Sequence, residues 1–227
     1  MKKIIIVEDE KNIANGLKFN LESEGYSVKI FSTAEDAMGS YASFDLMILD
    51  IMLPGINGFD FLAHIRSIDP KYPVLILSAK TEEENILKGL SGGADDYISK
   101  PFSLQELLLR IKRILKRQEW YTNVLKKEES ITFGDFYINF DTQEAKTVQG
   151  SVVLTQYECY VMKYLIENKN RNVTREELLE KVWGYSNTME TRTVDAFISR
   201  LRKYFESNLK EPRHIKSIRS VGYRFSA

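Results

Sequence analysis

Four ionisable residues each follow a short apolar run that predicts a β-strand: Glu8, Asp9, Asp50 and Lys100. In an open α/β sheet the carboxyl ends of parallel strands line one crevice, so these side chains are expected to share a pocket. Carboxylates crowded in a cleft repel one another unless a cation lies among them, and an oxygen-only ligand set suits Mg²⁺. The spacing therefore predicts a metal-assisted phosphoryl site.

The elements that would position this site alternate along the first half of the chain. Apolar runs lie at 3–7, 27–31, 45–49, 73–77 and 96–98, and helical patterns lie near 10–24, 33–41, 58–68, 82–91 and 103–117. In the first helical pattern Ile13, Leu17 and Leu21 share one face, and Gly25 is placed to end the helix. Five βα units with continuously apolar strands predict a doubly wound, five-stranded parallel sheet.

Length and composition bound the remaining possibilities. The chain has 227 residues, 43% hydrophobic and 28% charged, which suits two globular domains. No run reaches the roughly 18 apolar residues of a membrane span, and the N-terminal stretch is too short for a signal peptide, so a cytoplasmic protein without a membrane partner is expected. Cys159 is the single cysteine, which excludes an internal disulfide and suggests a core residue. With only two histidines besides, a structural zinc site is not expected.

The pattern of apolar, charged and turn residues changes after residue 117. A charged, irregular stretch at 118–130 predicts a linker between a first domain at 1–117 and a second at 131–227. Short strands and tight turns within 131–154 predict an antiparallel platform. Three helices and a hairpin are expected beyond it, at about 155–168, 174–182, 189–206 and 214–226.

Two of these helices carry start signals. Thr155 and Thr174 are expected N-caps, and Glu158 and Glu177 follow three residues later, so two capping boxes are predicted.

A net charge of zero conceals an asymmetry between the two halves. Residues 1–117 carry 15 basic and 17 acidic side chains, whereas 118–227 carry 17 and 15. Between Arg192 and Arg224 nine basic residues stand against three acidic ones, a net charge of +6. Such a stripe is typical of proteins that bind a phosphate backbone, with a merely solvated basic face as the alternative.

The helix expected at 189–206 has two distinct faces. Its apolar positions recur every three or four residues and should face the core: Val194, Phe197, Ile198, Leu201 and Phe205. The opposite face is expected to hold Arg192, Ala196, Ser199, Arg200 and Lys203. About 16 residues at a rise of about 1.5 Å give a rod near 24 Å, which fits a DNA major groove. We interpret it as a recognition helix, the alternative being an ordinary amphipathic surface helix.

Motifs at both ends of the chain are specific enough to indicate a family. In the first half they are Glu8-Asp9 and the stretches at 49–55, 78–80 and 93–102; in the second half they lie at 154–155, 182–184, 192–195, 199–203 and 222–225. On these residues the chain resembles a two-component response regulator of the OmpR/PhoB family. The resemblance implies a flavodoxin-like receiver domain followed by an α+β winged helix-turn-helix domain with an N-terminal β platform. It implies a phosphorylation-dependent transcriptional regulator rather than an enzyme.

The resemblance also implies roles for the four rim residues. Asp50 would accept a phosphoryl group from a sensor histidine kinase. Glu8, Asp9 and Asp50 would hold Mg²⁺, with the Met52 backbone carbonyl as a further ligand. Lys100 would pair with the acceptor carboxylate and then with phosphoryl oxygens, at a Lys-Pro bond that is usually cis in the family.

A switch is implied on the neighbouring strands. The Ser78 hydroxyl would donate to a new phosphoryl oxygen, and the Tyr97 ring would turn into the space that the hydroxyl vacates. Plain packing of Tyr97 is the alternative. Met52 and Lys80 would tune dephosphorylation by water.

Phosphorylation is expected to promote a homodimer through an ion-paired face. The residues implied are Lys88, Asp95, Asp96, Glu106, Arg110 and Arg117. Ile86 departs from the family where a basic residue usually answers Glu106, and the nearby Lys88 is the candidate substitute.

The dimer is expected to bind double-stranded DNA at paired, direct-repeat half-sites, with RNA polymerase as a candidate partner. The DNA contacts implied are Arg192, Thr193, Ser199, Arg200, Lys203, Arg219, Tyr223 and Arg224. Arg192 and Lys203 should mainly touch phosphates, and Ser199 and Arg200 should reach base edges. The terminal hairpin could reach an adjacent minor groove or the backbone, and Ser220 replaces the common wing glycine there, which constrains the turn if a positive φ is needed.

Three rival functions make different demands on the sequence. A hydrolase of the haloacid dehalogenase type needs a second acid two residues after the first, and Met52 occupies that place. A nucleotide-binding domain needs a glycine-rich turn after the first strand, where Glu8, Asp9 and Glu10 would repel phosphates. A regulator whose receiver is never phosphorylated stays open, although its usual mark, loss of an acid, of Asp50 or of Lys100, is missing.

Overall fold

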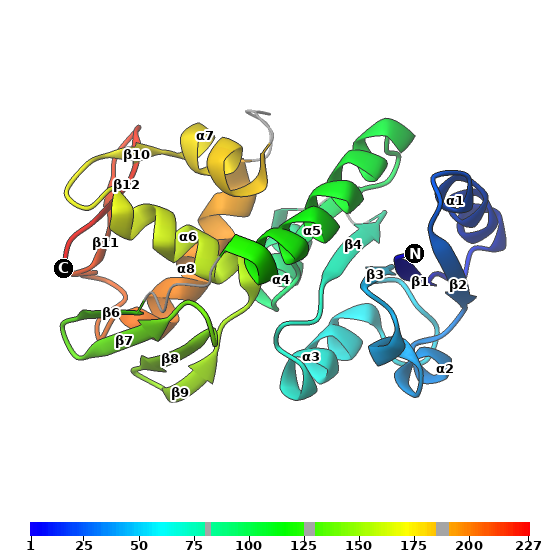
Figure 1. The fold of residues 1–227 in the computed structure, drawn as a ribbon, viewed down its shortest axis with the longest axis horizontal. Coiled ribbons are helices and arrows are strands. Elements are labelled where there is room, and N and C mark those ends of the chain that lie inside the picture. Colours follow the sequence, from blue (N-terminus) through cyan, green and yellow to red (C-terminus); the bar gives the residue numbers. More distant parts are fainter. Residues whose placement is uncertain (80–82, 125–129, 185–190) are drawn as a thin grey trace. The chain divides into compact units, whose positions relative to one another are not determined.

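The computed structural model describes residues 1–79, 83–124, 130–184 and 191–227 (Figure 1). The chain divides into two compact units, Met1–Arg117 and Gln118–Ala227. Within the described residues, none of the helices combines the length and the apolar character that crossing a membrane requires.

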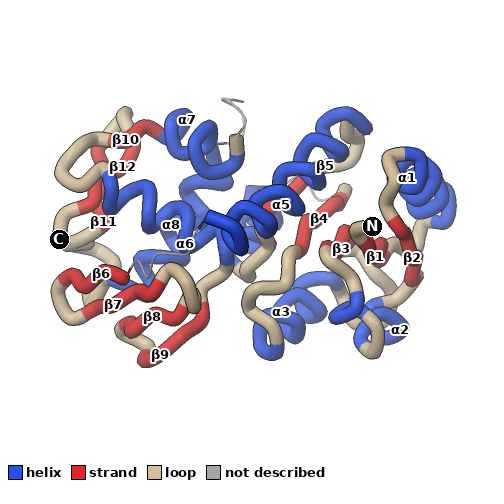
Figure 2. The backbone as a smooth tube through the Cα atoms, in the orientation of Figure 1, coloured by secondary structure: helices blue, strands red, loops and turns tan. Residues whose placement is uncertain are grey.

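The first unit alternates strands and helices, as Figure 2 shows by colour. Its elements are β1 (Lys3–Val7), α1 (Lys11–Ser23), β2 (Ser27–Phe31), α2 (Ala34–Met38), the 3₁₀ turn η1 (Tyr41–Ser43), β3 (Leu46–Leu49), α3 (Gly58–Ile68), β4 (Val74–Ser78), α4 (Glu83–Ser91), β5 (Asp96–Ser99) and α5 (Leu104–Val124). The helix predicted at 33–41 ends earlier, because Gly39 follows Met38 as its C-cap.

The strands form one parallel sheet in the order β2-β1-β3-β4-β5, which confirms the predicted doubly wound fold. Nearly every residue of β1, β3 and β4 is buried, which explains why these strands read as continuous apolar runs. The strand order reverses at β1, and ligands of such sheets bind at the carboxyl ends of the strands beside that reversal.

Beyond the end of α5, the second unit continues with strands, as predicted. Its elements are β6 (Ser130–Phe133), β7 (Phe136–Asn139), β8 (Glu144–Thr147), β9 (Gly150–Val153), α6 (Gln156–Glu167), β10 (Val173–Thr174), α7 (Arg175–Leu178), the π-helical turn η2 (Leu179–Trp183), α8 (Thr191–Phe205), β11 (Ile215–Ile218) and β12 (Gly222–Phe225). The antiparallel platform β6-β7-β8-β9 is confirmed, and β10-β12-β11 form a second antiparallel sheet. This is a winged-helix arrangement.

The core of the second unit lies where the helical pattern placed it. The five apolar positions predicted for α8 are each at most 1% exposed. Trp183 stacks on Tyr157 at 5.4 Å between ring centroids and meets Phe197 edge-on at 4.9 Å. Cys159 is buried, which confirms it as a core residue.

Two local predictions need correction. The helix α5 continues to Val124 and so occupies the first part of the expected linker, because no glycine or proline interrupts it and each added residue extends the hydrogen-bonded ladder.

The capping box of Thr155 and Glu158 is complete. The box at Thr174 is only half formed: the Glu177 carboxylate accepts instead from the Tyr164 hydroxyl and from Arg171.

Candidate functional site

The parallel register brings the predicted rim residues together. The Asp50 N–H donates to the carbonyl of Val7, the last residue of β1, at 2.9 Å. The Lys100 N–H donates to the carbonyl of Ser78, the last residue of β4, at 2.8 Å. Since Glu8 directly follows Val7, side chains from four strand ends meet at one edge of the sheet.

Asp50 is held by three donors. Lys100 Nζ lies 2.6 Å from Oδ2, whereas the Ser78 hydroxyl and the Met52 N–H donate to Oδ1 at 3.0 and 2.8 Å. Asp50 is only 3% exposed. The carboxylate is therefore fixed in orientation, with a cation beside one oxygen, which suits a nucleophile that must attack along a defined line.

Glu8 shares the same ammonium group. Lys100 Nζ lies 2.7 Å from Glu8 Oε2 and 3.6 Å from the exposed Glu10. Burial raises the pKa of Glu8 to about 7, with the charge of Asp50 adding to the effect and the Lys100 hydrogen bond opposing it. Burial works against the charge of Lys100, but the hydrogen bonds to Asp50 and Glu8 outweigh it and the pKa of Lys100 is raised.

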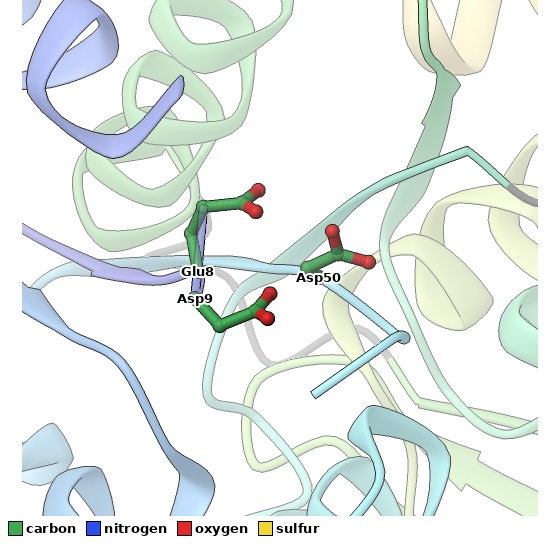
Figure 3. Close-up of side chains that lie close together, drawn as sticks. All are labelled: Glu8, Asp9 and Asp50. Carbon is green, nitrogen blue, oxygen red and sulfur yellow. The ribbon is translucent and has the colours of Figure 1, made fainter. Parts of the chain in front are cut away.

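The carboxylates also meet the requirements of a cation site. One oxygen from each of Glu8, Asp9 and Asp50 lies within 4.8 Å of the others. Figure 3 shows Glu8 and Asp9 coming from the end of β1 and Asp50 from the end of β3. Of these three acids only Glu8 and Asp50 pair with the Lys100 ammonium, so the cluster keeps excess negative charge, and its hard oxygen donors suit a divalent ion. The residues therefore fit Mg²⁺; the Met52 carbonyl as a ligand stays a prediction.

Sequence reasoning missed the role of Gly58. A Cβ atom at this position would lie 2.3 Å from the Asp50 carbonyl oxygen and 2.7 Å from Ile51 Cα. Only glycine therefore lets the start of α3 approach the backbone of Asp50. Asn57, whose side chain accepts from the N–H groups of Phe59 and Asp60, caps the helix there. An Asn-Gly pair ahead of a helical pattern was the available signal.

The predicted switch residues occupy neighbouring strands. Ser78 already donates to Asp50, and Tyr97 on β5 is 6% exposed. The Tyr97 ring lies so close to Gly89 of α4 that a Cβ there would be 3.2 Å from it. The peptide bond between Lys100 and Pro101 is cis. Lys80 lies outside the described residues.

Four of the six residues predicted for a dimer face already form ion pairs within the chain. Arg110 bonds both Asp96, at 2.8 and 2.9 Å, and Glu106, at 2.6 Å. Asp95 accepts from Arg66 of α3 at 3.1 Å. The Lys88 ammonium lies 4.5 Å from the centroid of the Phe59 ring, and the Arg117 side chain is outside the described residues. Dimer ion pairs would have to exchange with these internal ones.

On α8, the structure corrects the expected polar face. Arg192, Ser199 and Lys203 are exposed, but Ala196 is buried, and so is Thr193, which was expected to contact DNA. Arg200 is 5% exposed.

The direction of the Arg200 side chain explains its burial. Its Nε lies 2.6 Å from Glu158 Oε1, and its guanidinium lies 4.5 Å from the centroid of the Phe197 ring. In this position the guanidinium is paired with a buried carboxylate of α6 and does not point to solvent, so contact of Arg200 with base edges stays a prediction that would require the side chain to move.

The terminal hairpin is partly as expected. Arg219 is exposed at the tip, and Ser220 has a φ of 57°, the positive value that the common glycine would accommodate. Arg224 Nε donates to Asn172 at 2.7 Å. Tyr223 is only 4% exposed, and burial together with the Asp195 carboxylate raises its pKa to about 12.

Comparison with known proteins covers both units. A model described as response regulator receiver domain matches residues 4–112, and one described as transcriptional regulatory protein, C terminal, matches residues 149–225. The chain is 40% identical to the alkaline phosphatase synthesis transcriptional regulatory protein PhoP of Bacillus subtilis, over 98% of this chain and 96% of PhoP. It is 36% identical to the response regulator ArlR of Staphylococcus aureus, over 98% of this chain and 99% of ArlR.

Solved structures agree over the full length. The response regulator DrrB, a Thermotoga maritima OmpR/PhoB homologue, is 36% identical with a TM-score of 0.53 and complete coverage of both chains. A mutant form of RitR is 26% identical with a TM-score of 0.77, covering 100% of this chain and 99% of the other. Because both models match in this order and full-length relatives share the arrangement, the chain belongs to the OmpR/PhoB family of response regulators, the phosphorylation-dependent transcription regulators of two-component systems, which have a kinase and DNA as partners.

Proposed function

We propose that Asp50 is the residue that accepts the phosphoryl group, from a phosphohistidine of a sensor histidine kinase. The observation that carries the proposal is the position of its carboxylate, fixed by Lys100, Ser78 and the Met52 N–H beside two further acids. The bond that forms joins an Asp50 carboxylate oxygen to phosphorus, and the bond that breaks is the phosphorus–nitrogen bond of the phosphohistidine.

The side chains around Asp50 meet the needs of this transfer. Charge in the transition state is spread over the equatorial phosphoryl oxygens, so groups that neutralise it lower the barrier. Lys100 is placed to move from the Asp50 carboxylate to a phosphoryl oxygen, and Ser78 can donate its hydroxyl proton to another. Bound Mg²⁺, held by Glu8, Asp9 and Asp50, would supply further positive charge.

The output belongs to the second unit. We propose that Arg192 and Lys203 contact phosphates, that Ser199 reaches a base edge and that Arg219 and Arg224 serve the wing, since Arg192, Ser199, Lys203 and Arg219 are exposed and Arg224 is half-buried. Homodimerisation on phosphorylation, direct-repeat half-sites, contact with RNA polymerase and a cytoplasmic location complete the proposal.

Phosphorylation of the full chain by acetyl phosphate tests the acceptor. Wild-type protein with Mg²⁺ should gain one acid-stable, base-labile phosphoryl group, detected as a single mass increase and placed on Asp50 after reductive trapping of the acyl phosphate. Asp50→Asn should gain none, because an amide is too poor a nucleophile. Asp60→Asn, which alters an exposed aspartate of α3, is the matched control and should label normally. Label that persists on Asp50→Asn would place the acceptor elsewhere.

A further inference from the structure

Three polar side chains join the wing hairpin to the recognition helix. They are Arg175 at the start of α7, Asp195 in α8 and Tyr223 in β12. The Tyr223 hydroxyl donates to Asp195 Oδ1 at 2.6 Å, and Arg175 Nε donates to the same oxygen at 2.7 Å. Arg175 Nη2 also donates to the Tyr223 oxygen at 3.2 Å, which closes a triangle across three elements.

A second connection runs from the same helix to the other wing strand. Arg202 donates to the Ile215 carbonyl from Nε at 2.9 Å and from Nη2 at 2.6 Å, and Nη2 also donates to the Ser217 hydroxyl at 2.9 Å. Asp195 and Arg202 are seven residues apart, about two helical turns, so both leave α8 on one side. Each strand of the wing is therefore bonded to α8.

The Tyr223 ring is enclosed by the same residues. The guanidinium carbon of Arg175 lies 4.8 Å from its centroid and that of Arg202 lies 5.6 Å away, both within the range of cation–π attraction. Because the ring is buried and its hydroxyl proton is committed to Asp195, Tyr223 is occupied inside the domain rather than on a DNA-facing surface.

The charge of Asp195 supports a positioning role. A carboxylate among basic residues of a DNA-binding helix repels phosphates, so its presence there works against affinity unless it does something else. Here it is half-exposed and its charge is balanced by Arg175. Its three-element contact gives it a role that an alanine or a lysine at the same position would lack.

We propose that Asp195 and Tyr223 are positioning residues that fix the wing tip at Arg219 relative to α8, so that helix and wing engage DNA together. This proposal rests on the proposed DNA contacts. It assigns Tyr223 to the internal connection instead of the DNA contact that the sequence pattern predicts.

A measurement without DNA tests the connection directly. Spin labels at Ser199→Cys and Ser220→Cys, both exposed, report the distance between α8 and the wing tip in the full chain. Tyr223→Phe removes only the hydroxyl and Asp195→Asn removes only the charge, and each should broaden the distance distribution. Tyr160→Phe, which removes another hydroxyl from the same unit, on α6, should not. Unchanged distributions in both variants would overturn the proposal.

Binding to a selected DNA site gives the functional readout. Arg219→Ala should weaken binding by about tenfold and lower the salt slope by about one. Tyr223→Phe should produce a similar loss, and the double variant should lose little more, because a displaced wing no longer contributes. Strictly additive losses would contradict the proposal. If Arg192→Ala and Lys203→Ala leave wild-type affinity unchanged, the proposed DNA contacts fail, while the spin-label result still decides the connection.

Discussion

At the scale of single residues, the chemistry of the proposed phosphoryl site depends on how charges are balanced in a buried space. Glu8 and Asp50 are both nearly fully buried and share the Lys100 ammonium. Burial, with the charge of Asp50 adding to it, raises the pKa of Glu8 from 4.5 to about 7, and the hydrogen bond from Lys100 only partly opposes this. In the metal-free protein Glu8 therefore takes up a proton as the pH falls through about 7, which lowers the negative charge of the site.

Magnesium binding should therefore depend on pH. Because the folded-state pKa of Glu8 is raised, its protonated form stabilises the metal-free fold below pH 4.5, and that stability is lost as the pH rises through 7. Mg²⁺ must displace the proton, so its affinity should be about tenfold weaker at pH 6 than at pH 8. Calorimetry in buffers of different ionisation enthalpy should detect proton release near pH 6.5. Glu8→Gln should abolish this release; persistence would show that another group titrates.

Arg200 illustrates how a residue of the proposed recognition helix can stabilise the core. Its guanidinium lies against Glu158, which is 1% exposed and also completes the cap of α6. Removing one member of a buried pair leaves the other charge without compensation, which is more damaging than removing both.

Arg200→Ala should therefore act on stability. We expect a loss of about 3–5 kcal/mol in the free energy of unfolding, measured by urea denaturation. The double variant Arg200→Met with Glu158→Gln should lose less than Arg200→Ala alone. Lys203→Ala, at an exposed position of the same helix, should leave stability within about 0.5 kcal/mol. A normally stable Arg200→Ala protein with relaxed base preference would restore the base-reading role.

At the scale of elements, turns and caps decide where strands and helices end. The wing turn closes with the Val221 N–H donating to the Ile218 carbonyl at 3.0 Å, and Ser220 within it has a φ of 57°. Next to it Gly222 is required for another reason, since a Cβ would lie 2.1 Å from the Val173 carbonyl oxygen of β10. Close pairing of β10 with β12 thus depends on one glycine, whereas the turn works without one.

Ser220→Gly should relieve the strain of this turn. A residue with a side chain in the left-handed region is disfavoured by about 1–2 kcal/mol, and the greater freedom of glycine in the unfolded chain offsets part of the gain. We expect a net stabilisation of about 0.5–1 kcal/mol in thermal unfolding. Ser207→Gly, at a position with a negative φ, should instead destabilise. Destabilisation by both variants would show that Ser220 contributes a contact that outweighs its backbone strain.

At the scale of the whole molecule, chemistry and output occupy different units with opposite charge. Residues 1–117 carry a net charge of −2 and residues 118–227 a net charge of +2. An acidic receiver suits a cation-dependent site, and a basic second unit suits a polyanion. Under the proposed function, the link between them is dimerisation, which doubles the number of basic surfaces that bind one DNA molecule.

This coupling should appear in the salt dependence of DNA binding. The slope of log affinity against log salt concentration measures the phosphates neutralised, so phosphorylated protein on a paired site should show about twice the slope of protein on a single half-site. Fluorescence anisotropy between about 50 and 200 mM salt is the measurement. Asp50→Asn treated with acetyl phosphate should retain the single-site slope. Equal slopes for phosphorylated protein on both sites would rule out simultaneous binding by two subunits.

The sequence alone determined the architecture because its signals are local. Strand ends, apolar periodicity and the residues at 8, 9, 50 and 100 sit at spacings that a doubly wound sheet converts into one pocket. Thr155 and Glu158 likewise specify a cap within four residues. For each strand, helix and cap, residues close together in sequence carry the information, and the pocket follows because parallel strands end at one edge of the sheet.

Tertiary structure decided the direction of side chains whose partners are far away in sequence. Helical spacing predicts that Arg200 is exposed, but its side chain is buried because it pairs with Glu158, 42 positions earlier in the sequence. Tyr223 reads as a wing residue, yet Asp195 and Arg175 hold it inside. Helical periodicity gives the direction in which a side chain leaves its helix. Whether an oppositely charged, buried side chain lies in that direction depends on how separate helices and strands pack, so only the tertiary structure shows it.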